Sequence, residues 1–332
     1  MKAFLLICSL LFSAHAYAAN PAYHLINRFQ LGGEGGWDYL ALDSEARRLY
    51  IARATHVMVI EIETGKLIGD ISDTPGVHGI ALAPELNRGF TSNGRADSAS
   101  IFDLKTLKVI GQVKTGSNPD AILYDTFSKL VFTFNGRSQD ATLFNAASGE
   151  VVKTLALGGK PEFATTDGKG KVYVNIENTN EVAEIDSRLL SVTNRFSLKP
   201  CEEPTGMAID RARHRVFSGC HNKLMTVLDV ESGKVIATVS IGDRVDGNGF
   251  DDEPGLAFSS NGDGTMTVVR ESSPGKFEVA ETVTTQVGAR TMVIDPKTHN
   301  VYLPTAEFVP TTDPKSRPKI VDGSFVVLVI GR

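Results

Sequence analysis

Seven positions spaced 40 to 44 residues apart carry side chains that can coordinate cations, bind anions or move protons. They are Asp38, His78, Asp120, Glu162, Thr205, Asp246 and Arg290. Carboxylates and imidazoles coordinate divalent cations, and a guanidinium holds a carboxylate through paired hydrogen bonds. A histidine or a carboxylate also acts as a general acid or base. If the fold brings these positions together, the cluster can hold a cation or a small organic ligand.

The seven positions belong to a repeated pattern of strands and turns. Five residues after each of them comes a turn position, followed by a strand with an aromatic or leucine residue. The turn positions are Asp43, Ala83, Asp125, Asp167, Asp210, Asp251 and Asp295. A repeat of about 40 residues built from strands and turns is typical of a β-propeller blade. We therefore predict an all-β fold, a seven-bladed β-propeller with four-stranded antiparallel blades.

Blade five shows the expected strands most clearly, at Thr205–Ile209, Arg215–Ser218, Met225–Val230 and Val235–Ile241. The last repeat has only three strands, ending with Phe325–Ile330, whereas the segment Tyr23–Leu31 is a strand without a blade. Pairing these two strands completes the last blade and closes the ring, which removes an exposed sheet edge. In the last repeat, residues 306–324 form a long proline-containing loop between the second and third strands, either a lid or a surface excursion.

Repeat symmetry places equivalent residues at a similar radius and height, so the seven side chains should surround one mouth of the channel. Three interpretations remain open. In the first, the carboxylates bind backbone amides or water and pair with Arg290. In the second, the mouth holds a divalent cation, and the candidate ligands are Asp38, Asp120, Glu162, Asp246 and His78. In the third, Arg290 binds a ligand carboxylate and the catalytic candidates are His78, Glu162 and Arg290.

The same face should receive the ends of the second strands and the loops after them. Their polar residues are Arg53, His56, Asn93, Arg95, Asn135, Arg137, Glu177, Cys220, His221, Asn261 and Glu307. The turn aspartates lie at the opposite end of the innermost strands. A short aspartate side chain there accepts hydrogen bonds from nearby amides, so we interpret the turn aspartates as structural.

Residues 1–19 have the features of a secretory signal peptide. Lys2 precedes an apolar run from Phe4 to Phe12, and Ala16-Tyr17-Ala18 is a small-residue cleavage site. We therefore expect an exported, periplasmic or secreted protein without a membrane span, in which residues 20–332 form a single domain. The net charge of −5 argues against broad nucleic-acid binding, which needs a basic surface.

Export would leave two cysteines, Cys201 and Cys220. In the repeat frame, Cys201 lies in the loop that leads into blade five and Cys220 ends the second strand of that blade. Both lie on the same face, so we predict a disulfide between them. A metal site made by the two cysteines with His221 is the alternative.

Several strands resemble the YVTN-type repeat of seven-bladed propellers: Val172-Tyr173-Val174-Asn175, Leu49-Tyr50-Ile51-Ala52 and Val131-Phe132-Thr133-Phe134-Asn135. The chain thus looks like an exported YncE-like protein, and the resemblance implies mainly the fold. A WD40 identity is disfavoured because the single Trp leaves no repeated Trp-Asp pair. Related seven-bladed propellers include lactone-processing enzymes and quinoprotein-like proteins, but fold likeness is weak support for an activity.

The sequence contains no Gly-x-Ser-x-Gly, His-Glu-x-x-His or paired Cys-x-x-Cys motif. We therefore favour a binding or scaffold protein that holds a small ligand or a protein partner at the channel mouth. The alternative is a metal-assisted hydrolase of a lactone-like substrate, with His78 as general base and Arg290 as the anchor for a carboxylate. A quinone-cofactor enzyme is a third reading, disfavoured because the chain has little aromatic surface for stacking.

Overall fold

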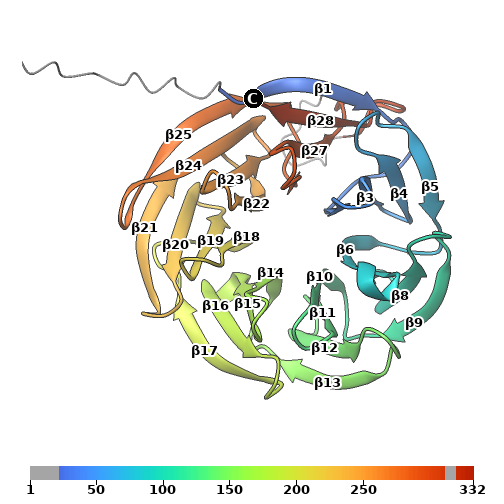
Figure 1. Ribbon diagram of the computed structural model, residues 1–332, viewed down its shortest axis with the longest axis horizontal. Helices are drawn as coiled ribbons and strands as arrows, with labels where there is room; N and C mark the ends of the chain where they lie inside the picture. The colour runs from blue at the N-terminus through green and yellow to red at the C-terminus, as the bar shows by residue number, and fades with distance from the viewer. Residues whose placement is uncertain (1–21, 311–318) are drawn as a thin grey trace, which may run out of the picture.

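The computed structural model describes residues 22–310 and 319–332. In this part of the chain, seven four-stranded antiparallel sheets follow one another around a ring, as Figure 1 shows. In the first six sheets the strand nearest the axis comes first in the chain and the outermost strand comes last. The prediction of a seven-bladed β-propeller is confirmed.

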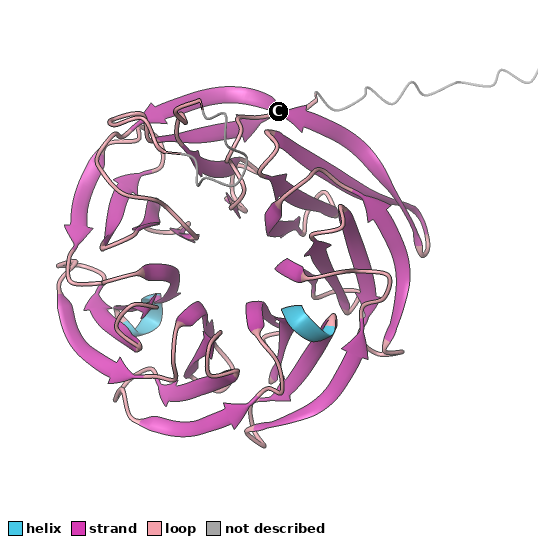
Figure 2. Cartoon of the chain, turned by 180° about the vertical axis from the view of Figure 1, so that it is seen from behind, coloured by secondary structure: helices cyan, strands magenta, loops and turns pink. Residues whose placement is uncertain are grey.

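The strands of blades one to four are β2(Leu40–Asp43), β3(Arg48–Arg53), β4(His56–Glu61), β5(Leu67–Ile71), β6(Val77–Ala83), β7(Arg88–Asn93), β8(Ser98–Asp103), β9(Val109–Lys114), β10(Pro119–Asp125), β11(Leu130–Asn135), β12(Asp140–Asn145), β13(Val151–Ala156), β14(Pro161–Thr166), β15(Lys171–Ile176), β16(Glu181–Asp186) and β17(Ser191–Ser197). Those of blades five to seven are β18(Pro204–Asp210), β19(Arg215–Cys220), β20(Leu224–Asp229), β21(Lys234–Ser240), β22(Val245–Asp251), β23(Leu256–Asn261), β24(Thr265–Ser273), β25(Lys276–Thr284), β26(Val293–Ile294), β27(Val301–Thr305), β28(Val326–Gly331) and β1(His24–Gln30). Two short 3-10 helices, η1(Pro84–Leu86) and η2(Glu177–Thr179), appear in cyan among the strands in Figure 2.

The apolar core lies between neighbouring blades. Each cluster of buried side chains joins two adjacent sheets, as where Phe132 and Phe134 of β11 pack with Val172 and Val174 of β15. Blade-to-blade packing of this kind buries both faces of the middle strands. This explains why those strands consist of nearly continuous apolar runs rather than alternating ones.

The ring closes where the two ends of the chain meet. Strand β1 pairs antiparallel with β28, from His24 opposite Gly331 to Gln30 opposite Val326. The last blade therefore has the order β1-β28-β27-β26, and β1 lies outside β28 in Figure 1. The predicted closure is confirmed, and it gives the backbone of β28 a partner strand along its outer edge.

The turn aspartates bind local amides, as expected. Asp210, for example, accepts hydrogen bonds from the backbone N–H groups of Ala212 and Arg213, each 3.0 Å long. Cys201 and Cys220 are buried and joined by the predicted disulfide, with their Cα atoms 5.5 Å apart. This bond fastens the loop that leads into blade five to the end of β19, and it excludes the alternative metal site, which needs free thiolates.

Two sequence predictions fall wholly or partly outside the described residues. These are the signal peptide at 1–19 and the middle of the 306–324 loop, of which the structure describes 306–310 and 319–324. Among the described residues, Phe308 and Ile320 form an isolated antiparallel bridge that joins the two arms of this loop. None of the described helices is both long and apolar enough to cross a membrane.

Candidate functional site

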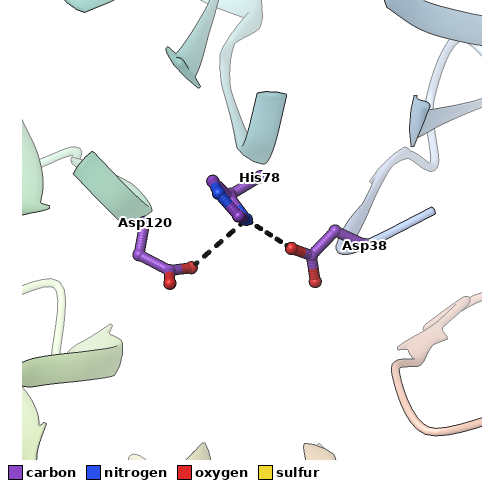
Figure 3. A group of neighbouring side chains, drawn as sticks. All are labelled: Asp38, His78 and Asp120. Carbon is purple, nitrogen blue, oxygen red and sulfur yellow. Dashed lines mark hydrogen bonds and ion pairs between the residues drawn. The ribbon is translucent and has the colours of Figure 1, made fainter. Parts of the chain in front are cut away.

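The seven predicted positions lie around one end of the channel, and six of their side chains fall into three separate groups. One group contains Asp38, His78 and Asp120, which come from blades one, two and three and point toward one another in Figure 3. A second contains Glu162, and a third contains Asp246 and Arg290. Thr205 stands apart, because its side chain is buried between strands.

In the first group, the imidazole of His78 lies between two carboxylates. Its Nδ1 is 2.6 Å from Oδ2 of Asp38 and 3.9 Å from Oδ1 of Asp120. Burial lowers the pKa of His78, but the hydrogen bond to Asp38 and the charges of both aspartates outweigh it and raise the pKa to about 9. Without a bound cation, the imidazole is therefore protonated at neutral pH and donates a hydrogen bond to Asp38.

In the same group, the surroundings of Asp120 oppose the ionisation of its carboxyl group. Burial, and then the negative charge of Asp38, raise its pKa to about 6, against the opposing charge of His78. The loop after β7 also shapes the site, because a Cβ atom at Gly94 would lie 2.9 Å from the His78 ring. Any larger residue at position 94 would therefore displace the imidazole from the two carboxylates.

Glu162 lies in a different environment, beside Lys160 and Glu177. Lys160 Nζ is 2.6 Å from Oε1 of Glu162 and also contacts Glu177. Burial, a hydrogen bond with Glu177 and the charge of Asp120 raise the pKa of Glu162 to about 9, and Lys160 only partly opposes them. Glu162 is thus a neutral acid at pH 7, a hydrogen-bond donor to Glu177 and a poor cation ligand.

Asp246 and Arg290 form the third group. Nε of Arg290 lies 2.6 Å from Oδ2 of Asp246. Burial raises the pKa of Asp246, and the charge of Arg290 and the charge of Asp38 act in opposite directions on it. Pairing with Arg290 therefore gives Asp246 a partner at the mouth, and it leaves the outer edge of the guanidinium next to the opening.

Thr205, the remaining ring position, points into the protein. Its hydroxyl donates a 3.0 Å hydrogen bond to the carbonyl of Val245 on the neighbouring blade, and only 4% of the residue is exposed. Similar bonds from one blade to a ring residue of the next join Thr291 to Asp38, Ser92 to Asp120, Asn175 to Thr205 and Ser260 to Arg290. These bonds fix the backbone from which the ring side chains project.

An aromatic pair obstructs the channel directly below the ring. Tyr39 follows Asp38 in blade one, and Phe163 follows Glu162 in blade four. Their rings meet edge to face with centroids 4.9 Å apart, which joins two blades from opposite sides of the ring. Burial, and then the charges of the four ring carboxylates, raise the pKa of Tyr39, so its phenol remains neutral. This pair spans the channel below the ring, and we call the mouth above it the cup.

Two clefts open from this cup. One has a volume of about 340 Å³ and runs past Asp38, His78 and Trp37. The other has a volume of about 520 Å³ and lies over blades six and seven. Arg290 lines both, so the two clefts meet at its guanidinium. The Nε1–H of Trp37, a residue of the smaller cleft, is buried without an acceptor among the described residues.

The geometry narrows the set of residues that could hold a cation. Asp38, His78 and Asp120 each offer one ligand atom, and these atoms lie within 4.8 Å of one another. Of the other predicted ligands, Glu162 is engaged with Lys160 and Glu177, and Asp246 is engaged with Arg290. Two carboxylate oxygens and a deprotonated imidazole nitrogen suit Mn²⁺ or Zn²⁺, and they form an incomplete shell for Ca²⁺. A bound cation would therefore displace the proton of His78, which makes its binding stronger as the pH rises.

The second-strand ends expected at this face divide into two sets. Arg53 is buried, with its guanidinium 3.6 Å from the ring centroid of Phe325 and one N–H donating to the carbonyl of Glu34. Asn93, Asn135 and Asn261 are also buried and bond within their own blades. Arg95, Glu177 and His221 do line the clefts or the Lys160 site.

Sequence reasoning did not single out Lys160, Arg244, Tyr39 or Phe163. Lys160 and Arg244 occupy equivalent positions, two residues before the ring position of their blades. Tyr39 and Phe163 are also equivalent, one residue after it. The repeat frame that located the ring could have found both layers, had the neighbouring positions been aligned in the same way.

The comparisons with known proteins bear on the fold. No protein-family model matches the chain, and no curated protein matches it. Among solved structures, hydrazine synthase of Kuenenia stuttgartiensis is similar with a TM-score of 0.70 and 15% identity, over 81% of this chain and 92% of that one. The WD40 propeller domain of Doa1 is similar with a TM-score of 0.71 and 10% identity, over 93% and 97% of the two chains. At these identities the likeness shows the propeller fold alone.

Proposed function

We propose that the protein is an exported, single-domain member of the YncE-like propellers that binds a small ligand at the channel mouth. A divalent cation held by Asp38, His78 and Asp120 is part of the proposed site. The YVTN-type strands and the N-terminal segment support family and export, and the buried disulfide is consistent with an oxidising compartment.

The observation that carries this proposal is the meeting of three ligand-bearing side chains above the aromatic pair that spans the channel. Asp38, His78 and Asp120 come from three different blades, and the pair of Tyr39 and Phe163 lies below them. A ligand entering the cup thus meets charged groups that lie above the aromatic pair. Concave sites with a few convergent polar groups over apolar walls are typical of small-molecule binding.

The proposal is tested by metal content and thermal stability. Protein purified without chelators is analysed for metals, and its melting temperature is measured with added Mn²⁺, Zn²⁺ or Ca²⁺. We expect at least one cation to raise the melting temperature, because a ligand that binds only the folded state stabilises it. Asp38→Asn and Asp120→Asn should abolish this shift, whereas Glu202→Gln, an exposed acid at the same face, should retain it. A metal-free protein that gains no stability from any of these ions would refute the cation site.

The metal-assisted hydrolase of a lactone-like substrate is the second candidate. It is favoured because Asp38 and His78 of the cluster line the same cleft as Arg290. A cation bound there would supply a Lewis acid for a carbonyl oxygen, and Arg290 would hold a carboxylate of the substrate. A panel of lactones assayed with the metal-loaded protein separates the two functions. Turnover that is lost in Asp120→Asn would replace the binding proposal by the hydrolase.

A further inference from the structure

The larger of the two clefts combines positive charge with apolar walls. It lies beside the ring over blades six and seven, and its volume is about 520 Å³. Arg244, Asp246 and Arg290 contribute its charged groups, and Val287, Phe308 and Val309 contribute its apolar surface. This volume falls within the range of about 300 to 1,000 Å³ that is typical of sites for small organic ligands.

The two guanidiniums are each held from one side. Arg290 donates through Nε to Asp246, and Arg244 donates through Nη2 to the carbonyl of Gly262 over 2.9 Å. A guanidinium has five N–H donors, so each retains several for a ligand. Two guanidiniums against the single carboxylate of Asp246 make the lining positive, although the whole chain carries a net charge of −5.

The apolar wall is unusually open to solvent. Val287 is 50% exposed and Val309 is 44% exposed, and both face the same cleft. Phe308 completes the wall, where it packs on Gly288 and lies 6.0 Å from Trp37 between ring centroids. Gly288 has a φ of +86° and no Cβ, and a Cβ there would lie 2.6 Å from the Phe308 ring. Removing three such side chains from water would favour an apolar ligand.

We propose that this cleft binds a small organic acid, with its carboxylate on Arg244 and Arg290 and its apolar body against Val287, Phe308 and Val309. Paired guanidinium N–H groups match the geometry of a carboxylate, which a lysine or a neutral donor does not. The inference deepens the proposed function, since the cleft opens from the same cup, but none of these five residues belongs to the cation cluster.

The test uses three probes of equal shape and different charge: 4-phenylbutyrate, 4-phenylbutylamine and 4-phenylbutan-1-ol. Their binding to the chelator-treated protein is measured by calorimetry, so that the result does not depend on the cation site. We expect the acid to bind roughly tenfold or more tightly than the alcohol, and the amine to bind most weakly, because charge-assisted hydrogen bonds form only with the carboxylate.

Matched variants identify the groups responsible. Arg244→Asn, chosen because Arg244 has a φ of +58° that Asn tolerates, should weaken the acid roughly tenfold and leave the alcohol unchanged. Arg290→Lys keeps the charge beside Asp246 but loses the planar fork, and should also weaken the acid. Phe308→Ser should weaken the acid and the alcohol together. Arg137→Asn, an exposed arginine of the same face outside the clefts, should change nothing.

Three results would overturn the inference: equal affinity for the three probes, no binding of any of them, or an equal loss in Arg137→Asn and Arg244→Asn. Failure here with a retained cation-induced rise in melting temperature would refute the cleft alone. The converse result would refute the cation site and leave the cleft in place.

Discussion

Asp120 and Asp125 lie at opposite ends of the same innermost strand, β10, and they are used in opposite ways. Asp125 is fully buried and accepts hydrogen bonds from the backbone and hydroxyl of Ser128 and from the hydroxyl of Thr166. Asp120 lies at the channel mouth, where its neighbours are the like charge of Asp38 and the imidazole of His78, both from other blades. Hydrogen bonds from its surroundings satisfy the carboxylate of Asp125, whereas the charge of Asp120 is only partly balanced by its neighbours.

The comparison teaches how to separate structural from functional acids in a repeat protein. Both positions recur in most blades, so recurrence does not distinguish them. The two kinds of aspartate differ in where their partners come from. At the turns the partners are mainly backbone amides a few residues away, whereas at the mouth they are side chains about 40 residues away. Groups that are charged, partly buried and incompletely paired are typical of functional sites.

The largest loss of stability is expected at the turn end. Asp125→Ala would leave the Ser128 amide and the Thr166 hydroxyl without their acceptor in a buried site. We expect a loss of about 2 to 3 kcal/mol in the free energy of unfolding, measured by denaturant titration. Cation binding at the mouth should be unchanged, and a variant that loses both would show that the two ends are coupled.

Thr205→Val should have a smaller effect of the same kind. Thr205 belongs to the ring by its place in the repeat, but its hydroxyl has a structural role and donates a hydrogen bond to the carbonyl of Val245. Loss of this hydrogen bond should cost about 1 kcal/mol of unfolding free energy and leave ligand and cation binding unchanged. A loss of binding without a loss of stability would return Thr205 to the functional set.

In contrast to the two preceding variants, Asp120→Asn is expected to raise the free energy of unfolding. The pKa of Asp120 is raised in the folded protein to about 6, above its ordinary value of 3.8. Between these values the folded state holds more protons than the unfolded state, so ionisation of Asp120 opposes folding as the pH rises. The variant should therefore match the parent near pH 3.5 and gain up to ~3 kcal/mol at pH 7.5, the free energy that corresponds to a pKa difference of about two. Equal losses at both pH values would make Asp120 structural.

The smallest change in stability, but a clear spectroscopic one, is expected from His78. Its pKa is raised to about 9, above the ordinary value of 6.5. The stabilisation from its ion pairs is fully present below pH 6.5 and is lost as the pH rises through about 9. NMR titration of the imidazole in metal-free protein should give this raised pKa, and Asp38→Asn should lower it. An ordinary pKa in the parent protein would show that the pair with Asp38 does not persist in solution.

The sequence carried the prediction of the fold and of the ring a long way. The strands expected in blade five agree with β18 to β21 within a residue or two at each end, and Tyr23–Leu31 does complete the last blade. The Cys201–Cys220 disulfide followed from the same frame. These predictions succeeded because each blade repeats one pattern, so that a residue's place along the repeat sets its place in space.

The partners of the ring residues were beyond that reasoning. Repeat symmetry treats Asp120 and Glu162 as equivalent, yet Glu162 meets Lys160 and Glu177 whereas Asp120 meets His78. Arg53, expected at the polar face, instead packs in the protein on Phe325. Such differences arise from side-chain lengths and from loops that vary between blades, and the repeat does not specify either.

By itself, the sequence determined the number of blades, the closure of the ring and the seven equivalent backbone positions around the channel mouth, because these depend on period and strand pattern. Only the tertiary structure decided which of those residues meet. Three ligand-bearing side chains converge on one side, Glu162 becomes a neutral acid on another, and Tyr39 and Phe163 meet across the channel beneath them. The physical reason is that pairing, burial and pKa depend on distances between blades far apart in the chain, which no local pattern encodes.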